Sequence, residues 1–545
     1  MTVQLRVLYW NPGGVAKKTR ELHTLARGQD IHVILLGETK LRPGQRFRLP
    51  NYHMYRRDEL APSGMPFRGT AVLVRHDVVH VALPLPAFTY TRSIGVEVNM
   101  AGVDVKLYAA YRPPGHLFAI QDIHTIFNDG PTLLAGDLNA KHTAWGSRIV
   151  NAVGRKLYAD AEGTGYEVLG PDAPTHVPTS DSSCADVLDI VLHKDLPCPV
   201  HVEVLYDLDT QHLPILVVFG LGAECVTLPR VRRRTDWEGF QRHISEIKYN
   251  SPLGTPEGVE AAAQVFTTTV QDALAASTTQ SRVETSKLEV LPIRLREMIK
   301  EKRELRKTWA HTRCPRVKRD LNALVERLTV EMREYRGTTW EARVDQAGES
   351  ATSLHHLARQ LARTGIPVCP LHNRSDERVY SAQDRAEILA EYMEGQFTPH
   401  PAAPAVREHY ERVEKRVQDF IQGPMPSLEG VSFIAPSETR SAGLRLPKRK
   451  APGLDEIPNM ALAMLPRKAV VALTRLYNGI LRTGHFPVLW KLGKVIVLPK
   501  PGKDRRDPAS YRPITLLSTL AKLFERLVLR RIVPSLNIRD EQYGF

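Results

Sequence analysis

Residues 131–142 decide the fold and read Pro-Thr-Leu-Leu-Ala-Gly-Asp-Leu-Asn-Ala-Lys-His. The apolar run Pro131–Ala135 predicts a buried strand, and Asp137 and Asn139 follow it two positions apart. On extended backbone alternate side chains point to the same side, so we expect this carboxylate and this amide to share one cleft. Such a pair can position a water molecule and stabilise charge on a phosphate. Gly-Asp-x-Asn at a strand end is a costly arrangement without a ligand, which argues against an ordinary turn.

Five other polar residues stand where apolar runs begin or end, and from these positions a side chain can project into a cleft. A carboxylate after a buried strand is a suitable hard ligand for Mg²⁺. A carboxylate inside an apolar run needs a partner, and a histidine paired with it can stay protonated for phosphate contact. Taken singly, each also has an ordinary interpretation as a turn or packing residue. The five are Asn11 after Leu5–Trp10, Glu38 after Ile31–Leu36, Tyr111 after Val105–Ala110, Asp189 within Val187–Leu192, and His212 before Leu213–Val218.

Residues 3–220 consist of short apolar runs separated by turns, with helical patterns between some of them. Runs such as Thr70–Val74 predict strands, whereas Lys18–Arg27 and Leu117–Asn128 predict amphipathic helices. Many short strands with few helices favour two packed sheets with helices outside. The predicted fold class is α+β, a four-layer α/β-sandwich of two mixed sheets flanked by helices, in a first domain at residues 1–222.

In chain order the seven polar residues are Asn, Glu, Tyr, Asp, Asn, Asp and His, at six strand ends. This order resembles the exonuclease–endonuclease–phosphatase superfamily, and the resemblance covers nearly all of residues 3–220. Ala140-Lys141-His142, followed by Trp145-Gly146, is similar to the endonucleases of Jockey-like non-LTR retrotransposons. The resemblance implies a metal-dependent endonuclease that nicks DNA by phosphodiester hydrolysis.

The resemblance also implies roles for the residues around the metal. Glu38 and Asn11 would hold a divalent ion, Mg²⁺ or Mn²⁺, which stabilises negative charge on the pentacovalent phosphate. Asp137, with Asn139 beside it, would orient or deprotonate the attacking water.

On the phosphate side of the site, the resemblance implies that Asp189 pairs with His212 and that His212 faces the scissile phosphate. The family usually has Ser-Asp-His where this chain has Thr210-Gln211-His212. The family aspartate adds negative charge to the metal site and glutamine does not, so weaker metal binding or a decayed nuclease is expected. Asp209 could compensate only if the loop shifts. The other expected phosphate or DNA contacts are Tyr111, Thr175, Lys141 and His142.

Charge is distributed unevenly along the 545 residues, whose net charge is +14. Residues 1–220 contain 21 basic and 22 acidic side chains, whereas the remainder contains 53 and 38. A basic second part suits a polyanion such as nucleic acid, and solvated surface charge is the alternative.

Cysteine content and hydropathy bear on the cellular compartment in which the protein is expected. The odd number of cysteines and the absence of a CxxC pair favour a reducing compartment over a disulfide framework or a zinc ribbon. No apolar stretch reaches the roughly 18–20 residues that span a bilayer, so no membrane partner is expected. No targeting signal is readable, and a location in nucleus and cytoplasm follows from the expected function alone. The cysteines are Cys184, Cys198, Cys225, Cys314 and Cys369.

Residues 223–438 differ in composition and are predicted to form a mainly helical linker region. The clearest helices are Ile293–Arg306 and Val317–Tyr335, which are dense in Lys, Arg and Glu. Two interpretations stay open, a linker with solvated faces or a helical arm that contacts nucleic-acid backbone.

Residues 439–545 form a third region, with a predicted strand at Val495–Pro499 and a predicted helix at Thr519–Ile532. Four motifs resemble, as a set, the opening of a non-LTR retrotransposon reverse transcriptase: Lys-Ala-Pro-Gly-x-Asp, Pro-Lys-Pro-Gly-Lys-Asp, Tyr-Arg-Pro-Ile-x-Leu-Leu-Ser and Gln-Tyr-Gly-Phe. The family's Tyr-x-Asp-Asp motif does not occur, so the resemblance implies a truncated polymerase that does not polymerise DNA by itself. Basic residues near the strand, which either bind phosphates or form a solvated surface, are Lys500, Lys503 and Arg512.

The leading hypothesis is a target-DNA endonuclease that leaves a 3′-hydroxyl. In the intact family protein this hydroxyl primes reverse transcription of the element RNA. One alternative is another phosphodiesterase on the same scaffold, because fold does not fix function. The other is a catalytically dead relic that only binds nucleic acid, which Gln211 and the incomplete polymerase motivate. The sequence predicts neither the target site nor the oligomeric state.

Overall fold

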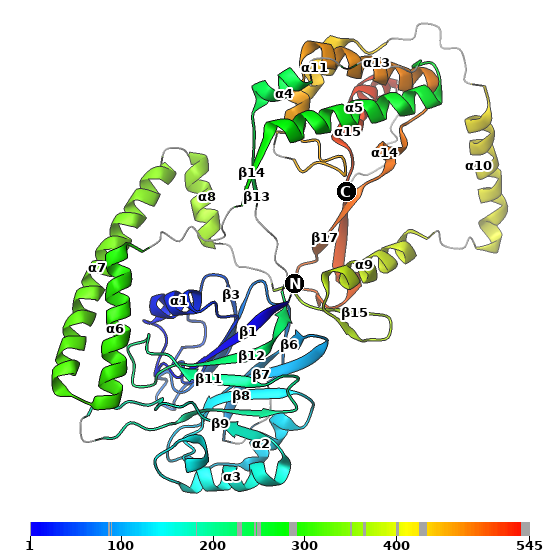
Figure 1. Cartoon of the computed structure of the whole chain (residues 1–545). Helices are drawn as coiled ribbons and strands as arrows, with labels where there is room; N and C mark the ends of the chain where they lie inside the picture. The colour runs from blue at the N-terminus through cyan, green and yellow to red at the C-terminus, as the bar shows by residue number, and fades with distance from the viewer. Residues whose placement is uncertain are drawn as a thin grey trace. The chain divides into compact units, whose positions relative to one another are not determined.

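The chain forms two compact units in the computed structural model (Figure 1). The first comprises Met1–Leu228 and Lys287–Ala390, and the second comprises Pro229–Ser286 and Glu391–Phe545. The Gln542–Phe545 motif and Arg449 lie outside the described residues. Those residues are 2–85, 88, 90–180, 183–225, 231–244, 247, 252–282, 291–348, 351–362, 367–398, 403–424, 433–448 and 450–535.

The strands of the first unit form a mixed, extensively hydrogen-bonded sheet system. Their bounds are β1 Thr2–Trp10, β2 Val33–Leu36, β3 Tyr52–Arg57, β4 Thr70–Arg75, β5 His80–Ala82, β6 Arg92–Met100, β7 Val103–Tyr111, β8 Thr132–Asp137, β9 Glu167–Leu169, β10 Asp189–Lys194, β11 Val200–Val204 and β12 Ile215–Glu224. The order is β3-β4-β2-β1-β12-β6-β7-β8-β10-β9, with β11 on β12 and β5 on β6. The two halves of this order meet where Ala223 of β12 pairs with Met100 of β6.

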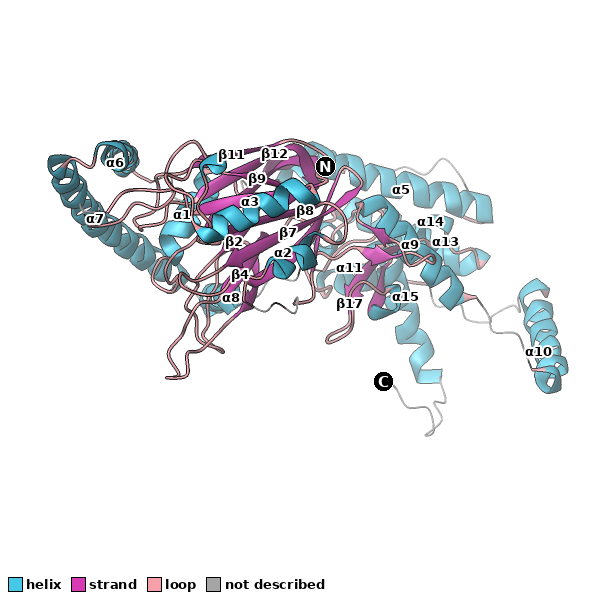
Figure 2. Ribbon diagram, turned by 90° about the horizontal axis from the view of Figure 1, so that it is seen from below, coloured by secondary structure: helices cyan, strands magenta, loops and turns pink. Residues whose placement is uncertain are grey.

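The two halves pack face to face through apolar side chains that alternate along each strand. Val7 and Val33 from one half share a buried core with Leu107 and Val191 from the other. The outer faces are covered by helices, α1 (Thr19–Gly28) on one side and α2 (Ile120–Phe127) and α3 (Ala152–Thr164) on the other (Figure 1). Figure 2 shows α2 and α3 from below, against the strands. The predicted four-layer sandwich is therefore confirmed.

A helical hairpin belongs to the same unit as the sandwich. It consists of α6 (Ile293–Thr312) and α7 (Pro315–Gly348), which contact each other through Leu295, Met298 and Leu328. Both predicted helices are confirmed and are longer than expected. α6 also packs on the sandwich, so the interpretation as a linker with only solvated faces is wrong for this helix. The other elements of residues 287–390 are α8 Ala351–Ala362, β15 Leu371–His372, β16 Arg378–Val379 and most of α9 Ala382–Phe397.

The second unit joins part of the predicted linker to the third region. Phe240 and Phe266 from the linker share a core with Leu473, Tyr477 and Phe524. The predicted helix at 519–532 and strand at 495–499 are confirmed. The elements are β13 Val231–Thr235, α4 Trp237–His243, α5 Pro256–Ser277, β14 Thr278–Arg282, α10 Pro404–Gln422, α11 Pro436–Leu444, α12 Asn459–Ala463, α13 Arg467–Thr483, α14 Val488–Lys491, β17 Lys494–Pro499, β18 Tyr511–Leu516 and α15 Thr519–Ile532.

The middle region is mainly helical, but it also contains two short antiparallel ribbons that the sequence pattern did not indicate. β13 pairs with β14, and β15 pairs with β16. The sequence boundaries at residues 222 and 438 stay predictions. Among the described residues, none of the helices is long and apolar enough to cross a bilayer.

Candidate active site

Three strand ends meet in register at one edge of the sandwich. The parallel pair β7–β8 sets Tyr111 opposite Asp137, and the antiparallel pair β8–β10 sets Asp189 opposite Asp137. β1 ends directly before Asn11. Polar residues that are far apart in the sequence therefore converge on Asp137.

Asp137 is buried and hydrogen-bonded on both oxygens. Asn11 donates from Nδ2 to Oδ2 at 3.0 Å, and the backbone N–H of Asn139 donates to Oδ1 at 3.1 Å. The Tyr9 hydroxyl accepts the backbone N–H of Asp137 at 2.7 Å and donates to the carbonyl of Ala110 at 3.1 Å. Burial raises the pKa of Asp137 because it penalises the charged form, and the hydrogen bonds only partly offset this.

Asp189 and His212 form a largely buried ion pair next to Asp137, with the His212 side chain 16% exposed. Nδ1 of His212 lies 2.9 Å from Oδ2 and 3.2 Å from Oδ1 of Asp189, and Nε2 lies 3.8 Å from Oδ2 of Asp137. Burial lowers the pKa of His212, but the carboxylates of Asp189, Asp137 and Glu38 outweigh it and raise the pKa to about 9. The imidazole is therefore protonated at neutral pH and can donate from both ring nitrogens.

Thr175 supports Asp189 from the backbone side. Its hydroxyl oxygen accepts the backbone N–H groups of Leu188 and Asp189, both at 3.0 Å. The side chain is fully buried. Its expected contact with phosphate stays a prediction. The observed hydrogen bonds show that Thr175 holds the backbone at the start of β10 in place.

The expectation that Asp137 and Asn139 share one side of extended backbone is wrong. β8 ends at Asp137, and Asn139 adopts a left-handed conformation with φ 49°. Its Nδ2 donates to the carbonyl of Arg112 at 2.9 Å, so the side chain fastens the turn after β8 to the end of β7. The backbone N–H of Asn139, rather than a parallel side chain, makes the contact with Asp137.

Glu38 and Tyr111 are hydrogen-bonded to each other near Asp137. Burial raises the pKa of Tyr111, and the charges of Glu38 and Asp137 and a hydrogen bond to Glu38 raise it further. Glu38 also pairs with Lys40, whose Nζ lies 3.1 Å from Oε1. The phenol stays protonated and is a hydrogen-bond donor in this acidic surrounding.

Two oxygen-rich groups could hold a metal ion. Ligand atoms of Asp137, Asp189 and His212 lie within 4.8 Å of one another. This group combines carboxylate oxygens with an imidazole nitrogen. Glu38, Asn11 and Asp137 offer only oxygen atoms, which is the donor chemistry that hard divalent cations prefer. The donor chemistry of this second group suits a hard divalent cation, and the assignment of Glu38 and Asn11 as metal ligands stays a prediction.

Lys141 and His142 take part in local structure. Nζ of Lys141 lies 2.8 Å from Oδ2 of Asp186. The ring of His142 stacks on Tyr158 at 4.3 Å, and its Nδ1 accepts the backbone N–H of Ala144. Their expected contacts with DNA stay predictions.

A cleft of about 460 Å³ opens beside these residues. Among its lining residues are Asn11, Glu38, Gln211 and His212. Gln211 donates from Nε2 to Thr179 at 3.2 Å. The cleft is also lined by three residues of the hairpin, Arg306, Trp309 and Lys318.

Sequence patterns missed two residues at the site. Tyr9 lies inside an apolar run and looked like a core residue, although its hydroxyl contacts the backbone of Asp137. The ring of His176 lies against that of His212, with centroids 4.6 Å apart and planes tilted by 55°, and burial lowers its pKa to about 4, so it is neutral. Its loop position carries no signal in the sequence, because the contact depends on the tertiary fold.

Comparison with known proteins finds one matching family and several similar proteins from mobile elements. Residues 8–212 match the model of the Endonuclease/Exonuclease/phosphatase family. The chain is 28% identical over 558 residues to the probable RNA-directed DNA polymerase from transposon X-element of Drosophila melanogaster, covering 99% of this chain and 60% of that protein. It is 28% identical over 559 residues to the RNA-directed DNA polymerase from mobile element jockey of the same organism, with the same coverage.

Among solved structures, the endonuclease domain of TRAS1, a telomere-specific non-LTR retrotransposon, is 20% identical, with a TM-score of 0.33 over 40% of this chain and 98% of that chain. The chain spans about 60% of the length of the curated relatives that it matches. Residues 8–212 of this chain therefore match the Endonuclease/Exonuclease/phosphatase family, and nearly the whole chain is similar to the RNA-directed DNA polymerases of the X-element and jockey mobile elements.

Proposed function

We propose that the first domain is a divalent-metal-dependent endonuclease that nicks target DNA and leaves a 3′-hydroxyl. The observation that carries this proposal is the buried chain of contacts from Asn11 to Asp137 to His212 to Asp189, at adjoining strand ends. It supplies a base, an oriented acid and hydrogen-bond donors within one site. These are the groups that phosphodiester hydrolysis requires.

Asp137 accepts the proton of the attacking water. A carboxyl group whose pKa is raised toward neutrality is a stronger base than an exposed one, and Asn11 and the Asn139 backbone hold it in place. His212, protonated and fixed by Asp189, donates to a non-bridging phosphate oxygen as charge accumulates there.

Glu38 and Asn11 are the residues that would hold the metal, Mg²⁺ or Mn²⁺, with Asp137 adjoining them. When bound, such an ion supplies positive charge that stabilises the phosphate oxygens and the departing oxygen. Tyr111 is hydrogen-bonded to Glu38 and orients that carboxylate. Asn139 fixes the turn that carries the backbone donor to Asp137.

The partners follow from this activity and from the relatives' names. The first is duplex DNA at an insertion target, and the second is element RNA in a longer protein that carries the complete polymerase. Such activity would be exerted in the nucleus, after synthesis in the cytoplasm. The 3′-hydroxyl is the product that a polymerase extends.

Basic residues of the third region are proposed contacts for nucleic acid in the polymerase part. Lys503 and Arg512 belong to the β17–β18 ribbon and its turn, and their side chains are exposed. Lys500 is braced, because its Nζ donates to the carbonyl of Ala509 at 2.7 Å. Replacing Lys503 and Arg512 together should therefore lower the affinity for RNA, and the dependence of that affinity on salt concentration, more than replacing Lys500 does.

An end-labelled duplex assay tests the nuclease proposal against repair and phosphatase activities on the same scaffold. With Mg²⁺, the protein should cut intact duplex, and a DNA polymerase should extend the new ends without prior phosphatase treatment. A duplex with one abasic site should not be cut preferentially at that site. Cutting confined to the abasic site, or ends that resist extension, would contradict the proposal.

A further inference from the structure

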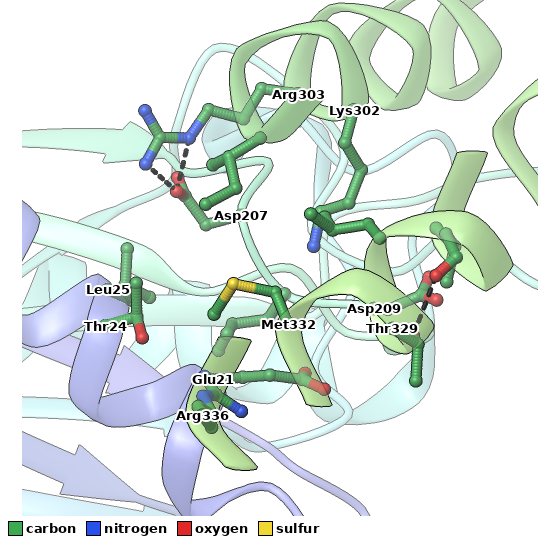
Figure 3. Close-up of a pocket in the computed structure, with 14 residues that line it drawn as sticks. Glu21, Thr24, Leu25, Asp207, Asp209, Lys302, Arg303, Thr329, Met332 and Arg336 are labelled. Atoms are coloured by element: carbon green, nitrogen blue, oxygen red, sulfur yellow. Dashed lines mark hydrogen bonds and ion pairs between the residues drawn. The ribbon is translucent and has the colours of Figure 1, made fainter. Parts of the chain in front are cut away.

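The loop that carries His212 is held from outside the family domain. α6 lies along residues 207–210, and two arginines one turn apart on this helix form ion pairs with it. Arg303 binds Asp207, and Arg306 binds Asp209. Figure 3 shows Arg303 and Asp207 beside Lys302 and Met332 in the pocket between the hairpin and this loop.

Arg306 makes a second contact that Arg303 does not make with any described residue. Its Nη2 donates to the backbone carbonyl of Thr210 at 2.5 Å, so one guanidinium group holds both a side chain and the backbone. The Arg306 side chain is only 4% exposed. A buried guanidinium is costly unless it is paired and hydrogen-bonded, so the geometry of the loop and of Arg306 depend on each other.

Thr210 connects this contact to His212. Its hydroxyl donates to the carbonyl of His212 at 2.6 Å and accepts Nε1 of Trp10 at 3.1 Å. On the other side of His212, Leu213 packs with Trp309 of α6. The helix therefore holds the chain on both sides of the histidine.

This contact also bears on Asp209, for which the expectation is compensation at Gln211 only if the loop shifts. The carboxylate at this position cannot replace the family aspartate at Gln211 in the described arrangement, because it is engaged by Arg306. Its charge is used to fasten the loop to α6.

We propose that Arg306 is a positioning residue of the nuclease, which fixes residues 209–212 so that His212 faces Asp137. The inference rests on the proposed endonuclease function. It extends the active site to a helix outside residues 8–212, the part of the chain that matches the family. The helical region is then a working part of the nuclease as well as a connection to the polymerase segment.

Arg306→Met and Arg303→Met in the full chain provide the test, with Arg303 as the matched control on the same helix face. Arg306→Met should lower kcat for plasmid nicking by about 10–100-fold with KM changed less than about threefold, because small displacements of a catalytic group are costly. Arg303→Met should change kcat less than about threefold. Arg306→Lys, which keeps the charge but loses the fork, should restore part of the rate.

Hydrogen exchange without metal or DNA gives a readout that is independent of activity. The Leu213 amide, which donates to the Thr175 carbonyl, should exchange faster in Arg306→Met and unchanged in Arg303→Met. Equal effects of the two substitutions on rate, or an unaltered Leu213 amide in Arg306→Met, would overturn the positioning role. A wild-type chain that does not nick would refute the proposed function instead, and the exchange comparison would still decide the role of Arg306.

Discussion

Asp137 and Asp189 are carboxylates buried in the sandwich, and donors from nearby backbone and side chains stabilise both of them. Asn11 and the backbone N–H of Asn139 donate hydrogen bonds to Asp137, and His212 donates one to Asp189. Burial of an unpaired carboxylate is strongly unfavourable, so these donors are a condition for folding as well as for chemistry. The two carboxylates lie opposite each other in register, and His212 lies between them.

Asp189→Asn should reduce stability in a pH-dependent way. The pKa of His212 is raised above its ordinary 6.5 to about 9, so its ion pair stabilises the fold fully below pH 6.5 and loses this contribution as the pH rises through about 9. The free energy of unfolding should therefore fall by roughly 2–4 kcal/mol at pH 6, and by much less at pH 9.5. Urea unfolding in EDTA at the two pH values measures this. An equal loss of unfolding free energy at the two pH values would contradict the charged ion pair between Asp189 and His212.

Gln211→Asp should strengthen metal binding. An added carboxylate about 4 Å from a divalent cation interacts with it by about 2 kcal/mol in water-like surroundings, which corresponds to roughly 30-fold tighter binding. The Mg²⁺ concentration for half-maximal nicking measures the change. Gln211→Glu adds the same charge on a side chain one methylene longer and is the control for side-chain length. An unchanged Mg²⁺ requirement would show that glutamine in place of the family aspartate at position 211 does not weaken metal binding.

The sequence predicted which residues converge but not how each is oriented. Apolar runs mark the strands, so residues at the strand ends, such as Asp137 and His212, could be predicted to meet. Asn139 could not be oriented, because its left-handed backbone depends on the turn after β8 and on a contact with Arg112. His176 was missed because its position next to His212 is set by tertiary packing.

At the scale of elements, α6 and α7 follow local helix signals, whereas their docking does not. Dense Lys, Arg and Glu predict helices with solvated faces, and most of α7 is exposed as expected. The partners of Arg303 and Arg306 lie almost a hundred residues earlier in the chain. No periodicity in the helix reveals them.

Trp309→Ala should destabilise the first unit. Trp309 is 3% exposed and packs against Val177 and Leu213, so its truncation leaves a cavity and costs about 3–5 kcal/mol. Trp340 of α7 is 47% exposed, and its truncation should cost less than about 0.5 kcal/mol. The urea dependence of hydrogen exchange in β1 and β12 reports this unit alone. Equal effects of the two substitutions would show that α6 does not stabilise the sandwich.

At the scale of the whole molecule, the units cut across the order of the sequence. Residues 287–390 belong with the sandwich, and residues 229–286 belong with the third region. Composition indicated a single linker because both parts are helical and charged. The sequence carries no signal for this division of the middle region between the two units. The division depends on two separate cores, one around Trp309 and one around Phe266.

The central claim is that the buried site around Asp137 hydrolyses DNA. A supercoiled plasmid with Mg²⁺, treated with the full chain or with its Asp137→Ala variant, tests it most directly. The wild type should convert supercoiled to open-circular DNA and lose this activity in EDTA, and Asp137→Ala should be slower by about 10³-fold, because a base and a buried charge are lost together. Absence of nicking by the wild type, or equal nicking by the two proteins, would contradict the claim.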